Sequence, residues 1–159
     1  MKINNTVIMT IPAPVRAYMQ EQQISDVYCV YQEIKNDGNY PDNCHPLTAN
    51  AVLKDQIERR YELMYIDHSC GLLSESNLLQ VIAKCRDLLA KKVLVECPTD
   101  FPLQESDLLS LGFYRCAMTD SETGATVYYI FDIKHYKPTP DWLNPKFWAN
   151  PQMWDKFRW

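Results

Sequence analysis

The pattern of apolar and polar positions is clearest in the middle of the chain, where it predicts a strand, a helix and a second strand. Residues 61–67, YELMYID, are nearly all apolar after Glu62 and predict a buried strand. Residues 75–90 carry their large apolar side chains on one stripe, which predicts a helix that Ser74 can cap. Residues 91–97, KKVLVEC, predict another apolar strand. Strands that are apolar on both faces lie in parallel sheets covered by helices, so this stretch should form a right-handed β-α-β unit.

The first third of the chain gives weaker signals. Residues 14–23, PVRAYMQEQQ, predict a short helix with a proline in its first turn. Residues 26–31, DVYCVY, are rich in β-branched and aromatic residues and predict a strand. Residues 36–46 are dense in turn formers, so a long loop is expected there. A helix capped by Thr48 is then expected to run to about residue 60.

The segment after the second apolar strand predicts a short helix and a hairpin. Residues 104–111, QESDLLSL, favour a helix, and Gly112 stands where a left-handed residue commonly ends one. Residues 113–120 and 125–133 predict strands joined by the tetrapeptide SETG. A connection of about four residues makes such strands antiparallel neighbours.

Together these elements predict an α/β fold. It is a Rossmann-like, mostly parallel sheet with helices on both faces and a C-terminal antiparallel hairpin. We assign residues 1–136 to this domain and residues 137–159 to an aromatic tail that holds all four tryptophans. Asn144-Pro145 and Asn150-Pro151 predict two short helical segments in the tail. We expect the tail to pack on the same domain or on a partner subunit as a homodimer contact; a stacking surface for another ligand or a lipid-interface segment is the alternative.

Composition and charge narrow the range of partners. Sixteen basic against twenty acidic side chains give a net charge of −4, which disfavours nucleic acid as a partner. The N-terminal residues do not form a signal peptide, and no apolar run approaches the ~20 residues of a membrane span, so we predict a cytoplasmic protein. The six cysteines are scattered along the chain, which favours buried free thiols in a reducing compartment.

The order of elements over residues 61–133 resembles the second half of class I S-adenosylmethionine-dependent methyltransferases, with YELMYIDHS as the strand that carries the substrate-side motif. The tail, DWLN-x-x-FWANP-x-x-WDKFRW, resembles that of a small uncharacterised gammaproteobacterial family with methyltransferase-like architecture. This second resemblance implies a fold and no known activity.

One departure from the methyltransferase pattern concerns the cofactor. Rossmann proteins that bind cofactors need glycines just after the first strand, where the backbone turns tightly and approaches the ligand. Here DVYCVY runs into QEIKND, and no glycine precedes Gly38. None of the four glycines belongs to a G-x-G pattern. We therefore expect the usual adenosyl site to be absent or remodelled and predict no cofactor, with S-adenosylmethionine as the alternative.

The residues that could carry chemistry follow the two central strands. Asp67 and His68 are the candidate catalytic pair, since ligands of α/β proteins bind at the carboxyl ends of parallel strands. Ser69 follows them, and Cys97, Thr99 and Asp100 end the next strand, so these four are candidate ligand-binding residues. A purely structural role is the competing interpretation: Asp67 and Ser69 satisfy loop amides and Cys97 is a buried thiol.

A zinc site is a further alternative, because Cys44-His45 and His68-x-Cys70 together contain two cysteines and two histidines. Their spacing is unlike that of known zinc motifs, so we predict no metal. The sequence thus favours a binding or interaction module of methyltransferase-like fold. The alternative is a small-molecule enzyme, a divergent S-adenosylmethionine-dependent methyltransferase, with its site near Asp67, His68 and Cys97.

Overall fold

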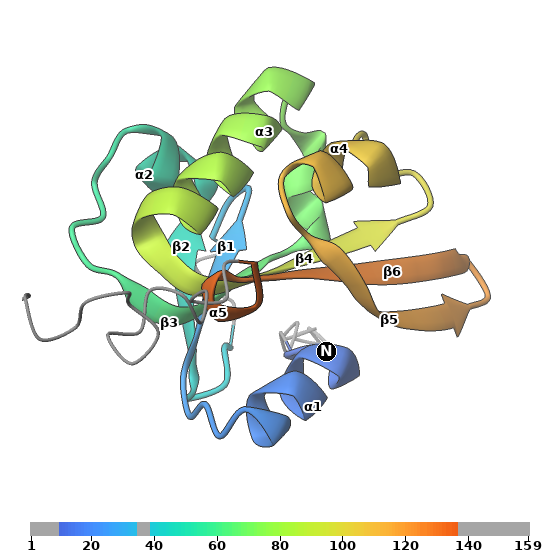
Figure 1. Cartoon of the computed structure of the whole chain (residues 1–159), viewed down its shortest axis with the longest axis horizontal. Helices are drawn as coiled ribbons and strands as arrows, with labels where there is room; N and C mark the ends of the chain where they lie inside the picture. Colours follow the sequence, from blue (N-terminus) through green and yellow to red (C-terminus); the bar gives the residue numbers. More distant parts are fainter. Residues whose placement is uncertain (1–9, 35–38, 137–159) are drawn as a thin grey trace, which may run out of the picture.

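The computed structural model describes residues 10–34 and 39–136. Its central feature is one six-stranded sheet with the strand order β2-β1-β3-β4-β6-β5 (Figure 1). In chain order the elements are α1 (Ala13–Glu21), β1 (Val27–Tyr31), β2 (Cys44–Thr48), α2 (Ala49–Leu53), β3 (Tyr61–Ile66), the 3-10 turn η1 (His68–Leu72), α3 (Glu75–Lys84), the π-helical turn η2 (Cys85–Leu89), β4 (Ala90–Pro98), α4 (Glu105–Ser110), β5 (Tyr114–Ser121), β6 (Gly124–Asp132) and α5 (Ile133–Tyr136).

The sheet is parallel at one end and antiparallel at the other, as predicted. Strands β2, β1, β3 and β4 are parallel, whereas β6 runs antiparallel to both β4 and β5. The unit β3-α3-β4 forms as expected, with Ser74 capping α3 through a hydrogen bond to the amide of Asn77. Gly112 ends α4 in the left-handed conformation, with φ of +85°, which a residue without Cβ adopts at little cost.

Helices cover both faces of the sheet (Figure 1). One core cluster lies between the sheet and α2, α3 and α4, and includes Ala49, Leu78, Ile82 and Leu108. The other lies beneath α1, whose Val15 and Met19 are buried against strand residues of the opposite face. Side chains that alternate along each central strand therefore enter two different cores. This alternation decides which strand-end residues meet.

Two expectations for the first third of the chain are wrong. The predicted loop 36–46 ends in strand β2, which pairs with β1 in parallel register and places Pro46 opposite Cys29. Pro46 is compatible with this position because β2 is an edge strand among residues 10–34 and 39–136, where one row of its backbone amides has no strand partner. The chain therefore has a second parallel strand in this region, which ends in Thr48.

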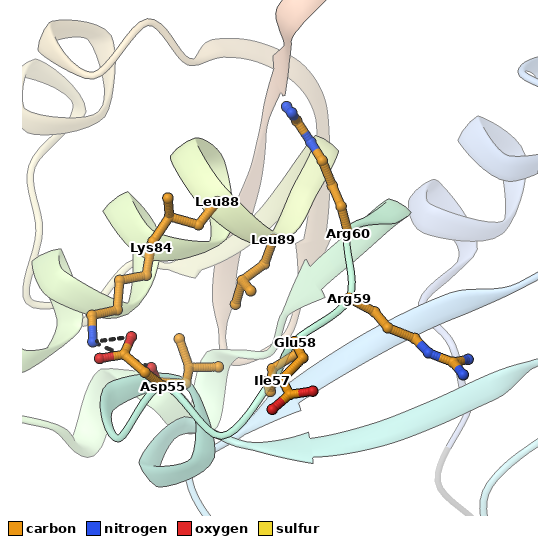
Figure 2. A pocket seen from close by; sticks show the side chains of 9 residues that line it. Asp55, Ile57, Glu58, Arg59, Arg60, Lys84, Leu88 and Leu89 are labelled. Carbon is orange, nitrogen blue, oxygen red and sulfur yellow. Dashed lines mark hydrogen bonds and ion pairs between the residues drawn. The ribbon is translucent and has the colours of Figure 1, made fainter.

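The helix predicted to run to about residue 60 is short and ends at Leu53. Asp55 adopts a left-handed backbone conformation, with φ of 54°, which stops the helix. Lys84 of α3 supplies a partner for the helix end, because its Nζ donates to the carbonyl of Leu53 at 2.7 Å. The same ammonium pairs with the Asp55 carboxylate at 2.7 Å (Figure 2). A long-range contact thus fixes where α2 ends.

No helix in the described ranges has the length and apolar character that crossing a bilayer requires. The aromatic tail, residues 137–159, lies outside the described residues, so its packing and its role as a dimer contact stay predictions.

Candidate functional site

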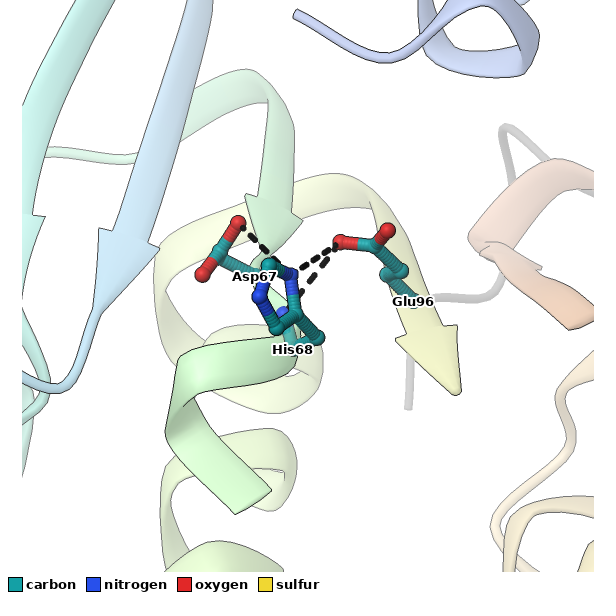
Figure 3. Close-up of side chains that lie close together, drawn as sticks. All are labelled: Asp67, His68 and Glu96. Carbon is teal, nitrogen blue, oxygen red and sulfur yellow. Dashed lines mark hydrogen bonds and ion pairs between the residues drawn. The ribbon is translucent and has the colours of Figure 1, made fainter. Parts of the chain in front are cut away.

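Asp67, His68 and Glu96 come together at the carboxyl ends of β3 and β4 (Figure 3). The parallel register pairs Ile66 with Val95, so the residues that follow them, Asp67 and Glu96, are neighbours across the two strands. Asp67 begins the turn η1, where its side chain accepts a hydrogen bond from the amide of Ser69 at 2.9 Å. The strand pairing and this cap place both carboxylates beside His68.

The imidazole of His68 lies between the two carboxylates. Its Nδ1 is 3.4 Å from Oδ1 of Asp67 and 3.1 Å from Oε2 of Glu96. The backbone amide of His68 also donates to Oε2 of Glu96, at 3.3 Å. The two carboxylates are largely buried, whereas the imidazole side chain is 61% exposed. One face of the ring therefore meets solvent, while its Nδ1 is held by the protein.

Two tyrosines complete the hydrogen bonding of Glu96. The hydroxyl of Tyr65 donates to Oε2 of Glu96 and lies 3.3 Å from Oδ1 of Asp67. The hydroxyl of Tyr128, on β6, donates to Oε1 of Glu96 at 3.2 Å. Both oxygens of this buried carboxylate are thus satisfied.

The electrostatics of the cluster follow from these contacts. Hydrogen bonds to Asp67 and then to Glu96 raise the pKa of His68 to about 10. Burial raises the pKa of Asp67, but hydrogen bonds from His68 and Ser69 outweigh it and leave that pKa below its usual value. Burial likewise opposes the hydrogen bonds from His68 and Tyr65 at Glu96, whose pKa is also lowered. At neutral pH one imidazolium thus stands between two carboxylates, for a net charge of −1.

These shifts set the pH range in which the cluster stabilises the fold. His68 contributes fully below its ordinary pKa of 6.5, and its contribution is lost as pH rises towards about 10. Asp67 and Glu96 contribute above their ordinary values of 3.8 and 4.5, and their contributions are lost as pH falls through the lowered values. All three contributions are therefore complete together between about pH 4.5 and 6.5.

We expect the His68 ring to remain protonated well above neutral pH and to release its proton near pH 10. Glu96→Gln should lower this pKa because it removes one of the two anions beside the ring. Nitrogen chemical shifts of the ring, followed by NMR over a pH series, measure both values. Glu58→Gln, at an exposed glutamate elsewhere, is the matched control. A ring that titrates near 6.5 in the wild-type protein would contradict the charge-paired geometry.

Asp67, His68 and Glu96 also have the residue types of a metal site. Their candidate ligand atoms all lie within 4.8 Å of one another, and within the described ranges no other group of this kind occurs. Each of these atoms, however, already has a hydrogen-bond partner within the cluster. A metal ion would have to displace the proton of His68. The arrangement is complete as a charge-paired cluster without an ion.

Other residues proposed from the sequence lie apart from this cluster. Cys97 enters the core on the face covered by α3 and α4, whereas Glu96 points to the opposite face of β4. Burial raises the pKa of the Cys97 thiol to about 12. Thr99 donates to the carbonyl of Ala125 at 2.9 Å, and with the exposed Asp100 it lines a depression of about 510 Å³ beside the β5–β6 turn. The structure thus groups Asp67, His68 and Ser69, and leaves Cys97, Thr99 and Asp100 elsewhere.

The two cysteines and two histidines of the zinc hypothesis do not converge. Nε2 of His45 lies 3.0 Å from Oδ1 of Asp26. The thiol of Cys70 donates to the backbone carbonyl of Val30, and the sulfur of Cys44 faces Cys29. Each candidate ligand therefore has a different partner.

Sequence reasoning missed Glu96, which is the residue that holds the cluster together. Its signal was a single acidic residue directly after the apolar run VLV of the strand KKVLVEC. A lone carboxylate in a buried strand needs hydrogen-bond donors. Which residues of the neighbouring strands donate to it depends on the strand register, and the sequence alone does not give that register.

A cavity of about 320 Å³ lies away from this cluster, where Arg60 enters β3 and Leu88 and Leu89 end η2 (Figure 2). The ammonium group of Lys84, which lines this cavity, already pairs with Asp55 and donates to the carbonyl of Leu53 at the end of α2. The side chains of Arg59 and Arg60 extend away from that pair (Figure 2). This cavity faces the amino-terminal edge of β3, opposite the edge where Asp67 and His68 lie.

The turn η1 covers the carboxyl end of β1. The amide of Asp67 donates to the carbonyl of Val30 at 3.0 Å, and Oγ of Ser69 accepts from the amide of Gln32 at 3.2 Å. Gln32 is the first residue after β1. In cofactor-binding Rossmann folds, backbone amides just after the first strand face the ligand. Here one such amide already has a partner in Ser69.

The strand order and the hairpin define a methyltransferase-like α/β fold. The structure is similar to magnesium protoporphyrin IX methyltransferase from Synechocystis with bound S-adenosylmethionine, at 12% identity over 73% of this chain and 74% of that one, with a TM-score of 0.51. A TehB-like S-adenosylmethionine-dependent methyltransferase from Corynebacterium glutamicum is similar at 13% identity over 71% of both chains, with a TM-score of 0.47. At such identities the similarity concerns the fold alone.

The family is shown by sequence. Residues 9–159 match the model of a family of unknown function, DUF6231, and the chain belongs to that family. No protein of curated function matches the chain in sequence.

Proposed function

We propose that this protein is a binding module built on a methyltransferase-like fold, without the standard S-adenosylmethionine site. The observation that carries this proposal is the hydrogen bond between the amide of Gln32 and Oγ of Ser69. A cofactor at the usual place needs free amides and close backbone approach after the first strand. The segment after β1 begins Gln32-Glu33-Ile34, without glycine, and Ser69 of η1 accepts a hydrogen bond from its first amide.

The ligand position we propose is the edge formed by Asp67, His68 and Glu96. His68 presents a protonated, solvent-facing ring, and the two carboxylates beside it leave the cluster with a net negative charge. Such an arrangement suits a small polar ligand that accepts a hydrogen bond from the exposed imidazolium. Neither His68 nor Cys97 has a pKa near neutral, which favours binding over acid–base or nucleophilic chemistry.

A divergent S-adenosylmethionine-dependent enzyme is the second candidate. Asp67 follows the strand that corresponds, in the resemblance, to the substrate-side motif of methyltransferases. The fold similarity to a methyltransferase solved with S-adenosylmethionine supports it as well. This candidate requires a cofactor site of altered form.

Calorimetric titration of the full chain with S-adenosylmethionine and S-adenosylhomocysteine separates the two candidates. We expect no binding heat at millimolar ligand, because Ser69 already holds the amide of Gln32 and no glycine follows β1 before Gly38. Saturable binding at micromolar concentrations would overturn the binding-module proposal. In that case Asp67→Asn, compared with the matched Asp100→Asn, would show whether the ligand lies at the β3–β4 edge.

A further inference from the structure

Cys29 and Cys44 face each other inside the core beneath α1. Their sulfur atoms lie 2.7 Å apart, on the neighbouring parallel strands β1 and β2. That separation is only about 0.7 Å longer than a disulfide bond. Both side chains are buried among apolar residues, in the cluster that also contains Val15 and Met19. Backbone pairing and core packing therefore hold the two sulfurs within reach of one another.

The pair differs from the other four cysteines. The thiols of Cys70 and Cys116 donate to backbone carbonyls, and Cys85 and Cys97 are buried in the opposite core. All six cysteines belong to the described residues, and no other two sulfurs among them lie within hydrogen-bonding distance. Proximity thus singles out Cys29 and Cys44.

The two thiols are also unequal. A hydrogen bond from the Cys29 thiol lowers the pKa of Cys44 to about 7, and the same bond, together with burial, raises the pKa of Cys29. The hydroxyl of Tyr31 lies 3.8 Å from the Cys44 sulfur and adds a second donor. Cys44 is therefore the sulfur with the larger thiolate fraction, which is the nucleophilic form.

Access to Cys44 comes from the sheet edge. Cys44 is the first residue of edge strand β2 and directly follows the exposed residues Asp42 and Asn43. Residue Cys44 retains 4% exposure, whereas Cys29 has none. Of the two residues, Cys44 is therefore the nearer to solvent, and a local opening of the sheet edge would admit a small oxidant to it first.

We propose that Cys29 and Cys44 form a reversible disulfide when the protein meets hydrogen peroxide. The Cys44 thiolate attacks one peroxide oxygen, the O–O bond breaks, and the departing hydroxide takes up the proton that Cys44 released on ionising. The resulting sulfenic acid is attacked by the Cys29 sulfur, so that the S–S bond forms, the S–O bond breaks, and a second water leaves with the Cys29 proton. The two thiols lose two electrons, and the peroxide is reduced to two waters.

The bond would tie edge strand β2 to β1. The two cysteines are fifteen residues apart, so the disulfide closes a loop in the unfolded chain and removes part of its conformational entropy. That loop includes Gln32, whose amide donates to Ser69 at the carboxyl edge of the sheet. Oxidation should therefore raise the melting temperature by roughly 5–10 °C in a way that a thiol reductant reverses.

The test is peptide mapping of the full chain after treatment with a small excess of hydrogen peroxide. Alkylation of the remaining thiols under denaturing conditions should fall from six cysteines to four, and mass spectrometry should find the peptides of Cys29 and Cys44 linked. Dithiothreitol should restore all six thiols. Oxidation first at the exposed Cys116, with the pair still reduced, would overturn the proposal.

Two variants assign the roles of the sulfurs. In Cys29→Ser the reaction should stop at a sulfenic acid on Cys44, which dimedone traps. Cys44→Ser should form neither the sulfenic acid nor the disulfide. Cys116→Ser is the matched control and should oxidise like the wild-type protein. A linked Cys29–Cys44 peptide in the wild type supports the proposal even if a serine variant does not fold, and dimedone labelling confined to Cys29 would contradict the order of attack.

Discussion

Replacing Glu96 by alanine should lower the melting temperature by roughly 5–10 °C, because the change removes an acceptor that several buried or charged donors share. Glu96 accepts hydrogen bonds from Tyr65 and Tyr128 and from both the ring and the amide of His68. Its side chain is only 13% exposed, so water replaces few of these contacts. Breaking a buried charge pair on one side typically costs about 3 kcal/mol, less where one partner reaches solvent as His68 does.

Thermal and urea denaturation at pH 6 measure this effect, since the cluster contributes fully there. Glu96→Gln should fall between the wild type and Glu96→Ala, because the amide oxygen still accepts one tyrosine hydroxyl. Glu122→Ala, at an exposed turn, is the control and should melt with the wild type. Equal melting of wild type and Glu96→Ala would mean that the cluster adds nothing to the fold.

The second large effect is expected from Leu78→Ala in α3, at about 2–5 kcal/mol of the free energy of unfolding. Leu78 is fully buried between α3 and the sheet, in the cluster that includes Met64 and Val93 of the central strands. Truncation removes apolar contacts and leaves a cavity that neighbouring side chains fill only in part.

Leu88→Ala is the matched control, because the side chain of Leu88 is 61% exposed although it lies in the same predicted helical segment. It should change the free energy of unfolding by no more than about 0.5 kcal/mol. Urea denaturation of the two variants measures the difference. An unchanged slope of the free energy of unfolding against urea concentration shows that both variants keep the fold. Equal losses of unfolding free energy in both variants would contradict the orientation of α3 and η2 against the sheet.

The middle and the end of the fold were predictable because their signals are local. Two apolar runs flank a helix with an apolar stripe, and each is long enough to determine its own structure. The stripe is wrong only at Leu88, which lies in η2 and is exposed. The short connection around Gly124 likewise settles the β5–β6 hairpin. These confirmed predictions depend on near neighbours in sequence.

The predictions fail where contacts with residues distant in sequence determine the structure. The segment Cys44–Thr48 contains a proline and polar residues, and it becomes a strand because β1 pairs with it. Helix α2 ends at Leu53, where Lys84, thirty-one residues away, donates a hydrogen bond to the carbonyl of Leu53. For the candidate site, Asp67 and His68 were predicted from their place after a strand. Glu96 was not, because only the β3–β4 register brings it to them.

The two outer strands of the sheet also bear on how the protein behaves at high concentration. An exposed strand edge can pair with another chain and begin a growing intermolecular sheet. Here one edge is β2, only five residues long and interrupted by Pro46. The other edge is β5, whose register with β6 shifts between Arg115 and Ala117, an irregularity of the kind that disrupts regular pairing. Both edges thus oppose edge-to-edge aggregation, and the proline that hid β2 in the sequence is part of that protection.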